Sequence, residues 1–77
     1  MLFRGQPRKR EQATRVIEEM DQKWTHLYEL ARKAKLSIYE MRQYLAIAKR
    51  SGIVENRSIY SGHGTSIPEW RKREEPL

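Results

Sequence analysis

The chain has 77 residues, a formal net charge of +6 and no cysteine, and 38% of its residues are hydrophobic. This length predicts one small domain, and the lack of cysteine excludes a disulfide framework, thiolate chemistry and a cysteine-ligated zinc site. The mean hydropathy of -0.92 predicts no run of the ~20 apolar residues that a membrane span requires. The chain turns basic at Arg4 before any apolar region forms, so we expect no signal peptide and a cytoplasmic location.

Positive charge is concentrated toward the beginning of the chain. Residues 1–15 carry five Lys/Arg and one Glu, and residues 16–50 carry seven Lys/Arg and five Asp/Glu. Residues 51–77 carry four basic and four acidic residues. The isoelectric point is about 10.0. This balance favours an anionic partner, of which nucleic acid is the common one. A solvated and highly charged surface is the alternative.

Hydrophobic periodicity predicts two helices in the first half. Residues 1–7 contain Gly5 and Pro7 without periodicity, and we expect a flexible basic arm there. Apolar residues at spacings of three and four predict a helix over about 8–22, which we expect, with the arm, to be the dimer element. A second periodic run predicts a helix over about 26–34, with Thr25 or His26 as its cap.

A third helix, over about 37–50, carries the clearest local signal. Ser37 and Glu40 have the spacing of a capping box, in which each side chain bonds to the other residue's backbone N–H. We therefore expect Glu40 to act as a cap rather than to accept a hydrogen bond from cytosine. Lys49 and Arg50 complement the dipole at the end of the helix, which stops at Gly52.

β-Branched and aromatic residues follow Gly52 and predict two strands, over about 53–59 and 65–71, joined by a glycine-containing turn. Pro68 cannot donate to a ladder, so the second strand should be an edge strand or be kinked there. Trp24 should pack between the first two helices, and Trp70 should close the strands onto the helices. Residues 72–77 are expected to form a charged, disordered tail.

This order resembles the winged helix-turn-helix family. The resemblance is carried by the run ELARKAKLSIYEMRQYL at residues 29–45, in which Ala31 is the small packing residue and Met41 and Leu45 match buried positions of the recognition helix. The resemblance extends from Trp24 to Arg71. The chain is similar, in particular, to the small basic winged-helix proteins of archaeal viruses and plasmids. It implies an α+β fold, with three helices followed by a two-stranded β-hairpin wing, over residues 8–71. Family members usually have glycine where this chain has Lys35, and a left-handed Lys35 would cost ~1–2 kcal/mol.

The resemblance also implies sequence-specific binding to double-stranded DNA by a transcriptional regulator, with residues 37–50 in the major groove. A homodimer is expected because one such module contacts few base pairs. Arg42 can pair with guanine and Gln43 with adenine, while Tyr39 can reach a phosphate or a thymine methyl. The groove-facing residues would be Ile38, Tyr39, Arg42, Gln43, Ala46 and Arg50. Phosphate contacts would come from Thr25, Lys33, Lys35 and Ser37, and wing contacts from Arg57, Tyr60 and His63.

A second resemblance is to the two-helix hairpin of the Sin anti-repressor family, whose members bind a repressor's oligomerisation helices rather than DNA. Its residues are Met20–Trp24, Leu27, Ala31, Ala34, Ser37, Glu40, Arg42, Tyr44 and Leu45. This alternative predicts two helices and a disordered final third, and it leaves the β pattern after Gly52 unexplained.

Neither resemblance supports an enzyme, and no recognisable arrangement of nucleophile, base and orienting carboxylate occurs. Gly62 and Gly64 precede no predicted helix, so they do not form a phosphate-binding loop. His63 has no second ligand at metal-binding spacing. We therefore expect no catalytic residue, no metal and no cofactor.

Overall fold

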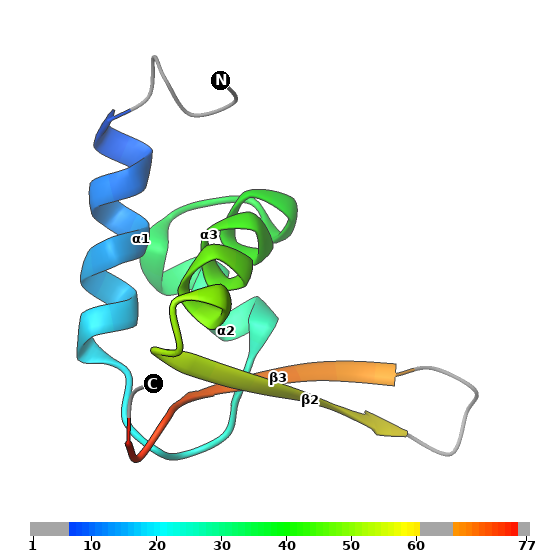
Figure 1. Cartoon of the computed structure of the whole chain (residues 1–77). Coiled ribbons are helices and arrows are strands. Elements are labelled where there is room, and N and C mark those ends of the chain that lie inside the picture. Colours follow the sequence, from blue (N-terminus) through cyan, green and yellow to red (C-terminus); the bar gives the residue numbers. More distant parts are fainter. Residues whose placement is uncertain (1–6, 61–65, 76–77) are drawn as a thin grey trace.

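The computed structural model describes residues 7–60 and 66–75. Its helices are α1 (Pro7–Glu19), α2 (Leu27–Ala34) and α3 (Ile38–Arg50), and its strands are β1 (Thr25–His26), β2 (Val54–Tyr60) and β3 (Ser66–Lys72) (Figure 1). The strands form one antiparallel sheet in the order β1-β3-β2. The described part of the chain thus confirms the predicted α+β class with three helices, and it adds one strand to the predicted hairpin.

The first helix is shorter than the sequence predicts, because α1 ends at Glu19 rather than near residue 22. The Asp21 carboxylate accepts a hydrogen bond from the Lys23 backbone N–H at 2.8 Å, which stabilises a turn. The Asp21 carbonyl accepts from the Lys72 N–H at 2.8 Å, so the chain is tied to β3. The expected position of Trp24 between α1 and α2 is therefore wrong: the turn carries this residue to the sheet.

A tight turn joins α2 and α3 at Lys35, which has the left-handed conformation considered for it (φ 58°, ψ 40°). The Leu36 N–H donates to the Ala31 carbonyl at 2.9 Å and the Lys35 N–H donates to Arg32 at 3.1 Å. These two bonds form a Schellman motif, which offsets the cost of a left-handed non-glycine residue. The predicted capping box of α3 is confirmed, with both Ser37–Glu40 bonds at 3.1 Å.

One hydrophobic cluster joins the helices to the sheet. From the sheet, Val54 is 1% exposed and Trp70 is 4% exposed, which confirms Trp70 as the residue that closes the strands onto the helices. Helix positions at spacings of three and four supply most of the cluster, as their periodicity predicts. The helical members are Ala13, Val16, Ile17, Leu27, Leu30, Ala31, Ala34, Met41, Tyr44, Leu45 and Ala48.

The hairpin agrees with the predicted strands to within about one residue, with a register running from Val54↔Lys72 to Tyr60↔Ser66. Lys72, assigned to the tail by the sequence, is the last residue of β3. β1 was not predicted, because a two-residue strand is too short to show alternation. It pairs through Thr25↔Trp70 and His26↔Glu69, which makes β3 the central strand.

The sequence predicts an edge strand or a kink at Pro68. β3 as a whole is the central strand, but β1 does not extend to Pro68, so the side of β3 away from β2 has no described strand paired there. The Arg73 N–H donates to Ile53 on the β2 side, whereas the Lys72 N–H donates to Asp21 on the opposite side. Backbone N–H directions alternate along a strand, and Pro68 lies four positions from Lys72. The Pro68 nitrogen therefore also points away from β2. β1 ends at His26, the partner of Glu69, so it does not reach Pro68. The backbone N–H that proline lacks would therefore have had no β1 acceptor, and no ladder hydrogen bond is lost.

Candidate nucleic-acid interface

The outer face of α3 presents most of the residues expected to contact DNA. Tyr39 is 62% exposed and Ile38 is 38% exposed, and Arg42 and Arg50 are also exposed. Gln43 and Ala46 are half-buried. The opposite face of the helix is buried in the core, so truncating an exposed residue of α3 leaves that packing in place. The buried residues of α3 are Met41, Tyr44, Leu45 and Ala48.

The start of α3 is held by charge as well as by its cap. Besides its bonds to Ser37, the Glu40 carboxylate accepts a hydrogen bond from the Lys9 ammonium of α1. Lys9, and then the Ser37 backbone N–H, hold the pKa of Glu40 below its ordinary value of 4.5. Glu40 thus acts as the cap that the sequence predicts. The Ser37 hydroxyl accepts from the Glu40 N–H and keeps its own hydrogen for another acceptor.

The expected phosphate contacts divide into two groups. Lys33 and Lys35 are exposed at the end of α2. The sequence predicts Thr25 at a helix start, but Thr25 lies half-buried in β1. Its hydroxyl donates a hydrogen bond to the Lys23 carbonyl at 3.2 Å. His26 occupies the N-cap position of α2 but makes no capping hydrogen bond through its side chain. A capping role for Thr25 or His26 is therefore wrong.

Within the described ranges, most basic side chains of the helical region have no partner. Of the 15 lysines and arginines in the described ranges, five bind a carboxylate or a carbonyl: Lys9, Arg57, Arg71, Lys72 and Arg73. The other ten form no ion pair or side-chain hydrogen bond within those ranges, and all ten are exposed. They are Arg8, Arg10, Arg15, Lys23, Arg32, Lys33, Lys35, Arg42, Lys49 and Arg50.

On the sheet, by contrast, basic and acidic side chains pair with each other. Arg57 contacts Glu69 at 2.9 Å, and His26 Nε2 lies 3.6 Å from the same carboxylate, which belongs to a residue only 7% exposed. Arg71 and Arg73 both pair with Glu55. The guanidinium carbons of Arg57 and Arg71 each lie 4.3 Å from the centre of the Trp24 ring, within the range of a cation–π interaction.

This charged cluster lies on the face of the sheet opposite the helices. Side chains alternate along β2, so Arg57 points away from the side on which Val54 packs into the core. The structure therefore does not bring Arg57 together with the outer face of α3. The Tyr60 backbone pairs with Ser66, and the Tyr60 side chain and all of His63 lie outside what the structure describes.

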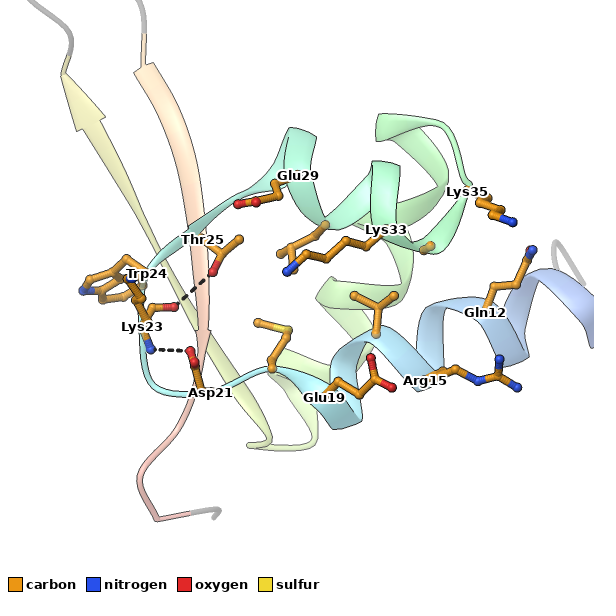
Figure 2. Close-up of a pocket in the computed structure, with 14 residues that line it drawn as sticks. Gln12, Arg15, Glu19, Asp21, Lys23, Trp24, Thr25, Glu29, Lys33 and Lys35 are labelled. Carbon is orange, nitrogen blue, oxygen red and sulfur yellow. Dashed lines mark hydrogen bonds between the residues drawn. The ribbon is translucent and has the colours of Figure 1, made fainter.

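A groove of about 660 Å³ lies between α1, the following loop and α2 (Figure 2). Figure 2 shows Gln12, Arg15 and Lys35 at one end and Asp21, Lys23, Trp24 and Thr25 at the other. Its floor is apolar and its rim carries both signs of charge, including Glu19 and Glu29. This mixture selects no ligand class, but it places the end of α2 and the middle of α1 on one side of the molecule.

The sequence did not single out six of the ten unpaired cations as candidate contacts, namely Arg8, Arg10, Arg15, Lys23, Arg32 and Lys49, and it did not predict the cluster around Trp24. The alternation of Glu55, Arg57, Glu69 and Arg71 was a usable signal for that cluster, because residues two apart share a face of a strand.

No family model, curated protein or solved structure matches the chain. In the described ranges, no helix has the length and apolar character of a membrane span, and no three His, Asp or Glu residues cluster as metal ligands.

Proposed function

We propose that this protein is a winged helix-turn-helix regulator that binds double-stranded DNA, with α3 in the major groove and the β2–β3 hairpin beside the phosphate backbone or an adjacent minor groove. The observation that carries the proposal is the set of ten exposed cations of the helical region that have no partner among residues 7–60 and 66–75. A duplex would supply the missing anions, because neutralising phosphates releases condensed counterions and drives binding.

The geometry of α3 supports base reading. Its 13 residues correspond to a length of ~20 Å at 1.5 Å per residue, and the major groove of B-DNA is wide enough to admit a helix. Arg42 and Tyr39 are exposed on the free face of this helix. The rigid α2–α3 turn at Lys35 fixes the two helices relative to each other, as a helix-turn-helix requires.

Phosphate contacts are best assigned to the end of α2. Lys33 and Lys35 are exposed and lack partners among the described residues, and they lie next to the start of α3. Arg57 already binds Glu69 and the Trp24 ring, so contacting a phosphate would mean giving up those interactions. We therefore assign the positioning of the hairpin, rather than a specific contact, to Arg57.

The test compares two single substitutions on two duplexes, one selected from a random pool and one of random sequence. Arg42→Ala should weaken binding to the selected duplex by ~1–3 kcal/mol and hardly affect the random one, since a guanine contact reads sequence. Lys33→Ala should weaken both about equally and reduce the dependence of log K on log salt by ~1. Fluorescence anisotropy with labelled duplexes measures all four affinities.

Thermal unfolding provides the control, because both changes are on the surface and should leave stability within a few tenths of a kcal/mol. Equal weakening of both duplexes by Arg42→Ala would show that α3 does not read sequence. If the chain binds no duplex even at low salt, the DNA-binding proposal is wrong.

A further inference from the structure

The sheet has one long free edge. In the order β1-β3-β2, β2 is an edge strand of seven residues, and its register with β3 runs without a bulge from Val54 to Tyr60. β2 contains no proline, and no other described strand pairs with its outer side, so among the described residues neither a proline, a bulge nor a covering strand blocks edge-to-edge pairing. Figure 1 shows β2 beside β3 in the hairpin.

The hydrogen-bond alternation defines which backbone groups of β2 face outward. Because the Arg73 N–H donates to the Ile53 carbonyl, the odd-numbered residues of β2 direct their N–H and C=O groups toward β3. The even-numbered residues Val54, Asn56 and Ser58 direct theirs toward the free edge. A second strand can thus pair only with these even positions.

We propose that β2 pairs antiparallel with β2 of a second copy of this chain, about a two-fold axis at Asn56. In this register Asn56 faces Asn56 and Val54 faces Ser58, so all outward backbone groups of the three residues meet outward groups of the partner. Each such pair exchanges two N–H···O bonds. The two sheets join into one, and the interface is isologous, as two-fold symmetry requires.

The side chains complement each other in the same register. Glu55 faces Arg57 of the second copy and Ile53 faces its Ile59, and symmetry repeats both pairs. Ile53 is 37% exposed and Ile59 is 38% exposed, and both lie on the face that also carries Glu55 and Arg57. These four pairs occupy the non-hydrogen-bonded positions, where opposite side chains approach most closely.

Neighbouring registers are unfavourable. Moving the two-fold axis by one residue places Glu55 opposite Glu55 or Arg57 opposite Arg57, and like charges directly opposite each other destabilise a strand pair. The register at Asn56 pairs opposite charges and joins the two exposed isoleucines. The pairing concerns assembly and stands whether or not the protein binds DNA, and it places the dimer contact on β2 rather than on α1.

Sedimentation velocity across a dilution series up to about 1 mM should show a monomer–dimer equilibrium. Ile53→Lys and Ile59→Glu should each weaken the dimer roughly tenfold, because each removes two symmetry-related isoleucine pairs. A mixture of the two variants should form heterodimers, since the introduced lysine then faces the introduced glutamate. Ile47→Lys is the matched control: Ile47 is 48% exposed but lies on α3, so the dimer should not change.

Ser58→Pro gives a second and independent test. The Ser58 N–H points to the free edge, so proline there removes an outward donor and spares the hairpin, as Pro68 does in β3. Hydrogen exchange of the unaltered chain should show protection that rises with concentration at Asn56 and Ser58 but not at Glu55 or Arg57. A monomer at every concentration would overturn the proposal. So would a dimer that is insensitive to Ile53→Lys, Ile59→Glu and Ser58→Pro while their thermal unfolding stays like that of the parent.

Discussion

The helical region and the sheet of this small protein use charge in opposite ways. Residues 7–50 contain 11 Lys/Arg and six acidic residues, whereas residues 51–75 contain four of each. In the sheet, the charged side chains pair across strands and around Trp24. In the helical region, ten basic side chains meet no partner within the described ranges. Paired charges contribute to a fold, while exposed unpaired ones are available to a ligand.

This contrast shows that the net charge alone does not locate a binding surface. Arg57 and Arg42 contribute equally to the net charge of +6, yet Arg57 binds Glu69 and Trp24 while Arg42 has no partner in the described ranges. An arginine that must first leave a carboxylate gives less binding free energy than a free one. We therefore expect substitutions in the two regions to change different measured quantities.

The largest effect is expected where the two regions share a core. Trp70 is 4% exposed and packs in the same cluster as the helices, so Trp70→Ala should lower the free energy of unfolding by ~3–5 kcal/mol. Chemical denaturation followed by far-UV circular dichroism and by Trp24 fluorescence should give coincident transitions. Helices that persist after the sheet unfolds would show that the two regions are separate folding units.

A smaller loss is expected from the paired charges of the sheet. Glu69→Ala removes the carboxylate that holds Arg57 and His26, so it should cost ~1–3 kcal/mol of unfolding free energy. Glu74→Ala is the control, because Glu74 is exposed and has no side-chain partner among the described residues, and it should cost nothing measurable. Equal stabilities of the two variants would mean that the cluster contributes nothing to the fold.

Arg57→Ala and Arg42→Ala compare the two regions directly. Loss of an ion pair and a cation–π contact at a half-exposed position should make Arg57→Ala about 1 kcal/mol less stable, with the exposed ion pair contributing the minor part. Arg42→Ala should unfold like the parent. Affinity for a selected duplex should fall more with Arg42→Ala than with Arg57→Ala, and the reverse ranking would contradict the division between the regions.

The smallest effect concerns the Lys9–Glu40 contact between α1 and α3. The pKa of Glu40 is lowered in the folded protein, so its carboxylate stabilises the fold above the ordinary pKa of 4.5, and this contribution is lost as the pH falls through the lowered value. Glu40→Gln keeps a residue that can complete the capping box. The stability difference between parent and variant should therefore shrink from about pH 6 to about pH 3 in urea titrations; a constant difference would argue against it.

Local signals predicted the elements that depend on neighbouring residues. The capping box at Ser37 and the glycine-bounded strands follow from side chains a few positions apart, and the structure confirms both. β1 and the end of α1 depend on distant partners, since Thr25 pairs with Trp70 and Asp21 bonds to Lys72. Periodicity extended the first helix because Met20 and Trp24 fit its spacing, whereas tertiary contacts end it at Glu19.

The same distinction holds for the candidate interface. Exposure of Tyr39, Arg42 and Arg50 follows from helical spacing relative to Met41 and Leu45, so the sequence was sufficient. Strand alternation places Arg57 and Glu69 on one face of the hairpin, but their direct pairing depends on the register of the two strands, which the sequence did not define. Which cations are free is thus a property of the fold rather than of composition.

The salt dependence of duplex binding tests the central claim most directly. Affinities of the unaltered chain for one duplex would be measured by fluorescence anisotropy over a series of salt concentrations. If the unpaired cations of the helical region neutralise ~4–6 phosphates per protomer, log K should fall against log salt with a slope of roughly -4 to -5. Affinity that does not change with salt, or no binding at the lowest salt, would contradict the account.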